Sequence, residues 1–277
     1  DQAPVRFLHT GSGWGALELR RREQAGEPPL SPAFAFPAGT LGSEQKKWLA
    51  LLESGSLPVQ PPSDLPGEWM VQPEWAALLD AALEQSGGQH WYSLLHQGVM
   101  RMEGFDPAGA QSAWEESIRL RPSAWAYRNL GVLALRRGDA AAACSLYRSA
   151  WDLALSIDPP PLALAIEYLQ LLVHAGEYAP GRDLYASLPP EIQQAERVQI
   201  LSGHIALALG DLESVEQVFS REYSVIREGE TTLTNLWFDY CALRETGKRW
   251  KELEKAQRKE LAARFPPPEK IDFRSVE

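Results

Sequence analysis

Two consecutive stretches of this sequence repeat one pattern. Residues 91–123 read WYSLLHQGVMRMEGFDPAGAQSAWEESIRLRPS, and residues 124–156 read AWAYRNLGVLALRRGDAAAACSLYRSAWDLALS. Small or aromatic residues recur 33 positions apart: Gly98 with Gly131, Ala110 with Ala143, Trp114 with Tyr147, and Ser117 with Ala150. Glycine and alanine let helices approach closely, and a large aromatic fills the space that remains between them. The pattern therefore predicts two consecutive helical hairpins.

Glycines that follow apolar runs predict the turns. Gly138, Gly176 and Gly210 each precede an acidic residue, and Gly104 and Gly247 are weaker cases, at intervals of 34, 38, 34 and 37 residues. Glycine adopts the left-handed conformation after a helix at little cost, and the acid can cap the next helix. Such periods are typical of stacked helical pairs. Further hairpins are expected near 162–188, 194–222 and 232–264.

The first two hairpins also carry a family resemblance. Tyr127 and Leu130-Gly131, with Ala143, Tyr147 and Ala150, resemble the tetratricopeptide consensus of an aromatic, Leu-Gly, Ala, aromatic and Ala. The resemblance weakens in the later hairpins, where Gly203 with Phe219 still repeats the small-then-large pair of Gly98 with Trp114. It implies an all-α, right-handed solenoid of tetratricopeptide-like helical hairpins over residues 90–265.

The rest of the chain divides into segments of different composition. Residues 1–39 predict an irregular N-terminal segment or linker with a short strand at 5–9, and residues 40–88 predict two leading helices near 43–53 and 73–85. Residues 266–277 are expected to be a C-terminal tail. Short motifs within residues 5–75, such as Gly13-Trp14-Gly15 and Trp48-Leu49-Ala50, resemble the linker of large bacterial proteins. Those proteins pair an N-terminal mutarotase-like β-sandwich with a helical C-terminal half, so we expect this chain to be such a half.

Composition excludes several classes of protein. A net charge of −10 argues against a general nucleic-acid surface, which needs clustered Lys and Arg. The sequence has no run of 18 apolar residues and no signal peptide, so we expect no membrane contact. Two distant cysteines, Cys144 and Cys241, suit a reducing compartment, and we expect a cytoplasmic protein. The chain starts at Asp1 without an initiator Met, which indicates either a trimmed mature start or, the explanation we favour, an excised piece of a longer protein.

Chemical motifs are weak. Gly11-Ser12-Gly13-Trp14-Gly15-Ala16 fits a dinucleotide fingerprint, but a Pro-rich stretch occupies the place of the required second strand. The five histidines have no metal-ligand spacing. We therefore expect no cofactor, metal or catalytic residue. The basic run from Lys248 to Arg264 is interleaved with acids and predicts the polar outer face of a terminal helix. Arg20-Arg21-Arg22 predicts either a loop at a domain edge or a contact patch.

Binding is therefore the leading hypothesis. In hairpins of the resembling family the first helix lines a groove, and the corresponding residues here are Tyr92, His96, Trp125, Arg128, Asn129 and Arg136. An aromatic beside Arg and Asn can grip a peptide, but it can equally pack against a neighbouring hairpin. The expected partner is a protein or peptide, and an N-terminal domain of the same polypeptide is one candidate.

Two readings of function remain open. The first is a non-catalytic repeat scaffold for protein–protein or interdomain contacts. The second is the accessory half of a carbohydrate-active enzyme whose catalytic β-domain is absent from this chain. We also predict that Trp114 and Tyr147 are core residues, and that a partner segment crosses Tyr92 and Trp125. That segment is either a peptide or this chain's own Pro-rich arm, residues 28–66.

Overall fold

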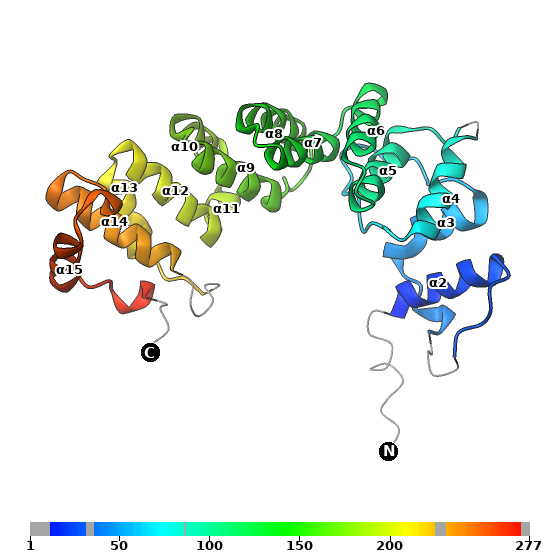
Figure 1. The fold of residues 1–277 in the computed structure, drawn as a ribbon, viewed down its shortest axis with the longest axis horizontal. Helices are drawn as coiled ribbons and strands as arrows, with labels where there is room; N and C mark the ends of the chain where they lie inside the picture. Colours follow the sequence, from blue (N-terminus) through cyan, green and yellow to red (C-terminus); the bar gives the residue numbers. More distant parts are fainter. Residues whose placement is uncertain (1–11, 32–35, 86, 225–230, 273–277) are drawn as a thin grey trace, which may run out of the picture. The chain divides into compact units, whose positions relative to one another are not determined.

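The computed structural model describes residues 12–31, 36–85, 87–224 and 231–272 (Figure 1). Within these ranges the chain is all-α, with fourteen α-helices, four short 3-10 helices and no strand. The predicted all-α class is thereby confirmed for this part of the chain. The strand expected at residues 5–9 lies outside the described residues.

Internal contacts divide the chain into two units, residues 1–139 with 145–159 and residues 140–144 with 160–277. The first unit contains α2 (Ser12–Gln24), α3 (Lys46–Ser54), α4 (Pro73–Leu83), α5 (Trp91–Glu103), α6 (Pro107–Leu120), α7 (Ala124–Arg136) and most of α8 (Ala140–Ala154). The second contains α9 (Leu162–Ala175), α10 (Tyr178–Ser187), α11 (Pro190–Gln193), α12 (Glu196–Leu209), α13 (Leu212–Ser220), α14 (Thr232–Thr246) and α15 (Lys255–Arg264). The 3-10 helices are η1 (Ala38–Thr40), η2 (Ser43–Gln45), η3 (Trp250–Glu252) and η4 (Glu269–Ile271).

The helices pack as antiparallel pairs. In the first unit α5 packs on α6, and in the second α9 packs on α10, α12 on α13 and α14 on α15 (Figure 1). These pairs and α7 with α8 begin and end within a few residues of the predicted hairpins. The two leading helices are α3 and α4, and α3 follows directly on η2.

The N-terminal glycines belong to a helix, not to the irregular segment that the sequence suggested. Ser12–Gln24 forms α2, which contains Gly13 and Gly15. A Cβ atom at Gly13 would lie 2.8 Å from the Thr40 carbonyl, and one at Gly15 would lie 2.4 Å from the Phe36 ring. These glycines therefore permit close packing inside a helix. The residues that follow, Ala16 to Gln24, are mostly strong helix formers.

Left-handed residues end the first helix of four hairpins, as the glycines predicted. Gly138, Gly176, Gly210 and Gly247 have φ angles of 80°, 75°, 80° and 69°. The turn after α5 differs, because Gly104 has φ −74° and Phe105 takes the left-handed position at φ 61°. The Asp106 amide donates to the Arg101 carbonyl at 2.8 Å, as the Asp139 amide donates to the Ala134 carbonyl at 3.0 Å. Phe105, not Gly104, is therefore the equivalent of Gly138.

The paired small and large residues of the first two hairpins meet in the core. All eight repeat positions are buried: Gly98, Gly131, Ala110, Ala143, Trp114, Tyr147, Ser117 and Ala150. A Cβ atom at Gly98 would lie 2.2 Å from the Trp114 ring, and one at Gly131 would lie 2.6 Å from the Tyr147 ring. The core position of both aromatics is confirmed, and it fixes how closely each pair of helices packs.

The later pair, Gly203 with Phe219, does not repeat this contact. The side chains nearest to Gly203 are Leu236 on α14 and Val218 on α13. Phe219 instead packs edge-to-face on α14, with its ring centroid 5.1 Å from that of Trp237 and 5.5 Å from that of Tyr240. The spacing of the pair is retained, but the aromatic has turned toward the next helix because α14 offers it an aromatic partner.

Candidate binding site

The first unit binds one of its own segments. Residues 57–68, here called the covering loop, connect α3 to α4 and contain four prolines. Proline has no amide hydrogen, so such a segment presents carbonyl groups to its neighbours with few donors of its own. Its carbonyls therefore depend on side-chain donors or on water.

Side chains from α3, α5 and α7 supply these donors. The indole N–H groups of Trp48, Trp91 and Trp125 donate to the carbonyls of Glu68 (3.1 Å), Gln60 (2.9 Å) and Asp64 (3.0 Å). The hydroxyl of Tyr92 donates to the Pro66 carbonyl at 2.8 Å, and the Lys47 ammonium donates to the same oxygen. His90 Nε2 lies 3.1 Å from the Leu57 carbonyl. Five main-chain carbonyls of the covering loop are thus contacted by side chains of α3, α5 and α7 and by His90, the residue that caps α5.

Lys47 and His96 lie beside this contact and are both buried. The ammonium of Lys47 lies 5.6 Å from the centroid of the Tyr92 ring, and burial lowers the pKa of Lys47 to about 8. His96 packs edge-to-face between Trp48 and Tyr92, with centroid distances of 5.1 and 4.6 Å. Burial, together with the charge of Lys47, lowers the pKa of His96 to about 3, so this imidazole is neutral.

The arrangement is suited to holding a peptide backbone. Neither ring nitrogen of His96 has a hydrogen-bond partner among the described residues, so this ring contributes packing area. The Tyr92 hydroxyl and the Lys47 ammonium share one acceptor, and burial raises the pKa of Tyr92, so the phenol stays a hydrogen-bond donor. Each such hydrogen bond stabilises the folded state by about 1 kcal/mol.

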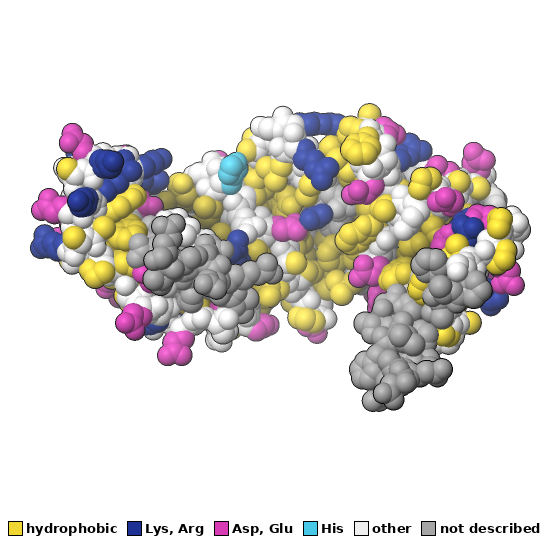
Figure 2. Space-filling view, turned by 60° about the horizontal axis from the view of Figure 1, so that its bottom comes forward, with side chains coloured by type: hydrophobic (Ala, Val, Ile, Leu, Met, Phe, Trp, Pro, Cys, Tyr) yellow, Lys and Arg dark blue, Asp and Glu magenta, His cyan; other side chains and the backbone are white. Residues whose placement is uncertain are grey.

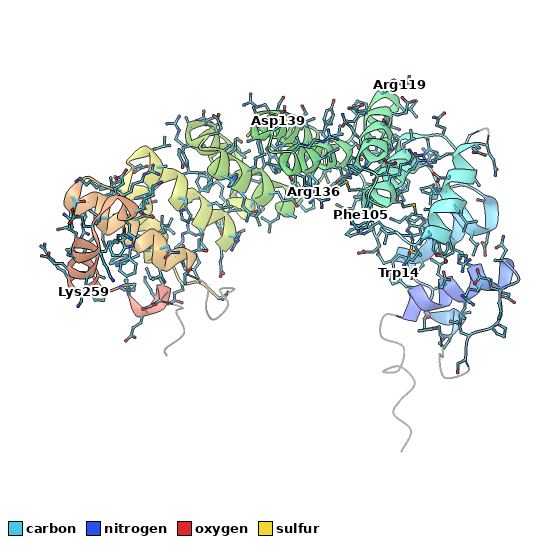
Figure 3. The ribbon with its side chains drawn as sticks, viewed as in Figure 1. Trp14, Phe105, Arg119, Arg136, Asp139 and Lys259 are labelled. Atoms are coloured by element: carbon cyan, nitrogen blue, oxygen red, sulfur yellow. The ribbon has the colours of Figure 1, made fainter. Side chains whose placement is uncertain are left out.

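Of the six residues predicted to line a groove, three gather around the covering loop. Tyr92 and His96 are buried beside it, and half-buried Trp125 bonds to it. Arg128 and Asn129 are half-buried on α7, where the guanidinium donates to the amide oxygen at 3.2 Å. Arg136 is exposed in the last turn of α7 (Figure 3).

The occupant of this face is thus the C-terminal part of the Pro-rich arm named among the predicted partners. Sequence reasoning did not find the donors Lys47, Trp48 and Trp91. One signal could have indicated them, because the Pro-rich segment lies between tryptophan-containing helices and needs donors for its carbonyls. The pairing itself is not readable from the sequence, since donor and acceptor lie 19 to 61 residues apart.

The N-terminal arginines are structural. Arg21 is buried and pairs with Glu18 at 2.8 Å and with Glu27 at 2.6 Å. These contacts raise the pKa of Arg21. Arg22 pairs with Glu27 at 2.8 Å. Arg21 and Arg22 therefore form ion pairs within α2 and the turn that follows it, and they are not part of an open contact patch.

The basic run near the C-terminus lies on α15 and the turn before it. The helix buries only Leu261, and Lys248, Lys251, Lys255, Lys259 and Arg264 are exposed. Figure 2 shows basic side chains gathered over the C-terminal elements, and Figure 3 labels Lys259 on α15. This agrees with a polar outer face on a terminal helix.

The described ranges hold neither a cluster of metal ligands nor a membrane-spanning helix. No three His, Cys, Asp or Glu side chains in these ranges come close enough together to hold a metal ion. Nor does any helix within them have the length and apolar character needed to cross a membrane.

The second unit carries an open groove that the sequence did not predict. It lies among α10, α12 and α13 and has a volume of about 290 Å³. Its lining is Arg182, Tyr185, Gln199, Ser202, Ile205, Ala206, Leu209, Asp211, Ser214, Gln217, Val218 and Arg221. The floor is apolar and the edges carry hydroxyl, amide and guanidinium groups. The hairpins here match the repeat pattern least, so no register was available to predict it.

Comparison with known proteins adds no assignment. The sequence matches no family model and no curated protein. The resemblances to the tetratricopeptide family and to the helical half of the large bacterial proteins therefore stay predictions.

Proposed function

We propose that this chain is a non-catalytic scaffold of tetratricopeptide-like hairpins that binds extended protein segments. The observation that carries the proposal is the covering loop, whose main-chain carbonyls are held by donors from α3, α5 and α7. Recognition through main-chain groups and aromatic side chains is how proteins bind Pro-rich peptides. In the first unit the bound segment belongs to the same chain, which favours an architectural role for this face.

The hairpins support the same function. Helical pairs that contact only their neighbours leave long faces open, and scaffolds use such faces for binding. Left-handed residues after α7, α9, α12 and α14 and buried small residues in the first two hairpins give the pairs a common construction. The two units differ in their surfaces, because a loop covers a helical face in the first and a groove is open in the second. A scaffold can vary such surfaces without changing the packing of its helices.

A peptide supplied in trans tests the proposal. The full chain is made with residues 57–68 replaced by a Gly-Ser linker of equal length, and a synthetic peptide of residues 56–70 is added. We expect the peptide to bind with micromolar affinity, measured by calorimetry, and to raise the melting temperature. A scrambled peptide of the same composition is the control. Equal binding of the two peptides would contradict the proposal.

Two substitutions in the intact chain keep the test decisive if the linker variant does not fold. Tyr92→Phe and Trp125→Phe each remove one donor to the covering loop and keep an aromatic ring at the position. We expect protease cleavage within residues 57–68 to become faster in both variants, because the loop opens more often. Unchanged cleavage rates would show that these bonds do not hold the loop.

A further inference from the structure

The groove of the second unit has the length of a short extended peptide. Gln199, Ser202, Ala206 and Leu209 line it from one face of α12. Ten residues of helix span about 15 Å, since each residue rises 1.5 Å. An extended chain advances about 3.3 Å per residue, so four to five residues fit along this face.

The floor and edges of the groove offer two kinds of contact. Ile205, Ala206 and Val218 form an apolar floor, and Leu209 at its end is 41% exposed. Tyr185 and Gln199 bond to each other across the groove at 3.0 Å, and the Gln217 side chain has no partner among the described residues. An apolar side chain would fill the floor, while the Gln217 amide and the Tyr185 hydroxyl would bond to the main chain of a ligand.

The lining of the groove holds two arginines and one carboxylate, although the chain as a whole is acidic. Arg182 and Arg221 lie among the lining residues, and the only carboxylate among those residues is Asp211. Asp211 caps α13, where it accepts from the Ser214 amide at 3.1 Å and from its hydroxyl at 2.6 Å. Arg182 pairs with Asp183, but both side chains are more than 60% exposed. Such a pair is weak, so a carboxylate of a ligand can take the place of Asp183. Arg221 forms no ion pair with a described residue.

We propose that this groove binds an extended peptide of about four residues that carries an apolar side chain and a carboxylate. The guanidinium groups of Arg182 and Arg221 bind the carboxylate, since their planar donor forks match its two oxygens. A duplex or single-stranded nucleic acid would need a longer run of cations than two arginines in a chain of net charge −10. The site extends the proposed function, because it places a second peptide-binding surface on the same scaffold.

Three acetylated tetrapeptides test the carboxylate and separate its two sources. Leu-Ala-Leu-Glu with an amidated end carries a side-chain carboxylate, Leu-Ala-Leu-Ala with a free end carries a terminal one, and amidated Leu-Ala-Leu-Gln carries none. Each is titrated into the ¹⁵N-labelled full chain, and the amide shifts of Ser202, Ala206 and Leu209 are followed. We expect at least one carboxylate peptide to bind roughly tenfold more tightly than the neutral peptide.

Matched substitutions then test the two arginines. Arg182→Gln and Arg221→Gln should each weaken binding of the carboxylate peptide about fivefold, because each removes a charge-assisted contact. Arg136→Gln, which makes the same charge change on α7 of the first unit, should leave it unchanged. The proposal is overturned if no shift appears at the three amides up to about 5 mM peptide. It is equally overturned if the neutral peptide binds as well, or if all three arginine variants behave alike.

This test is independent of the one for the covering loop. The tetrapeptides contain no proline and report on amides of α12, whereas the loop peptide reports on the first unit. Binding of the loop peptide without tetrapeptide binding would remove this site and leave the proposed function standing. Binding of the tetrapeptides without binding of the loop peptide would contradict peptide binding by the first unit and would support the groove.

Discussion

The hairpins α5–α6 and α12–α13 share a backbone frame and differ in their surfaces. Each first helix ends at a left-handed residue, Phe105 or Gly210, which lies seven positions after a buried glycine. The second helix of each is capped by an aspartate, since Asp106 accepts from the Gly109 amide at 2.8 Å and Asp211 accepts from the Ser214 amide at 3.1 Å. The same local signals thus build both hairpins.

Their faces are used in opposite ways. The face of α5 is closed by the covering loop, to which Trp91 and Tyr92 donate hydrogen bonds. The face of α12 between α10 and α13 is open and lined by polar edges. The backbone frame therefore depends on a few glycines and capping residues. The side chains between them decide whether a helical face binds a segment of the same chain or stays open to a partner. Substitutions at matched positions of the two hairpins test this difference.

The largest effect is expected at the residue that packs on the buried glycine. Trp114 in α6 is 4% exposed and bonds to the Leu95 carbonyl at 3.1 Å. We expect Trp114→Ala to lower the free energy of unfolding by about 3–5 kcal/mol, the usual cost of deleting a buried large aromatic. Val218→Ala at the matching contact with Gly203 should cost about 2 kcal/mol, because a smaller volume is lost.

Urea unfolding followed by circular dichroism measures both losses. Arg119→Gln on the exposed surface of α6 is the control, since its ion pair with Glu116 is solvent-exposed and contributes little. If Trp114→Ala unfolded at the wild-type urea concentration, the register of the first hairpin would be wrong.

The second effect concerns acid stability. His96 and Leu201 occupy matching positions, each two residues before the buried glycine of its helix. The pKa of His96 is about 3, against about 6.5 in an unfolded chain, because the buried ring resists protonation. The unfolded state therefore binds the proton first as the pH falls. This histidine stabilises the fold fully above pH 6.5, and that stability is lost progressively between pH 6.5 and pH 3.

His96→Leu should remove this pH dependence. We expect the wild-type chain to lose about 2 kcal/mol more than the variant between pH 7 and pH 5, at about 1.4 kcal/mol per pH unit below 6.5. Urea unfolding of both proteins at the two pH values gives the difference, and titration of other groups cancels in the comparison. Parallel losses in the two proteins would mean that His96 is protonated in the folded state.

A third effect distinguishes the closed face from the open one. Tyr92→Phe removes the hydroxyl that bonds to the buried side of the covering loop, and we expect a loss of about 1 kcal/mol. Tyr185→Phe removes a hydroxyl in the open groove whose hydrogen-bond partner among the described residues is Gln199. Water can replace that contact, so we expect a loss below about 0.5 kcal/mol. Losses of equal size would show that the two faces are equally accessible to water.

The sequence was informative where a backbone signal is local. Gly138, Gly176 and Gly210 each mark a turn on their own, because a left-handed residue and a following acid suffice to end one helix and begin the next. The covering loop depends instead on bonds between residues far apart, such as Trp125 with Asp64, and no local pattern encodes them. The sequence did not indicate helix α2 because Gly13 and Gly15 were assigned to an irregular linker, whereas their role is close packing.

The smallest effect tests the turn itself, where Phe105 stands in the place of glycine. Phe105 is 94% exposed at φ 61°, and Figure 3 shows it at the end of α5. A left-handed conformation costs a side-chain-bearing residue about 1–2 kcal/mol, and glycine avoids this cost but orders a more flexible chain. We therefore expect Phe105→Gly to raise the free energy of unfolding by about 0.5–1 kcal/mol.

The reverse change in the matching turn is the control. Gly210 has φ 80°, and nothing lies within 4 Å of a Cβ atom built on it, so Gly210→Ala introduces backbone strain without a steric clash. It should destabilise the chain by about 1 kcal/mol. Opposite signs for the two variants, measured by urea unfolding, would establish that the two hairpins share one turn geometry. A loss of stability in Phe105→Gly would show instead that the exposed ring makes a stabilising contact, and that the turn after α5 has been selected for more than its backbone.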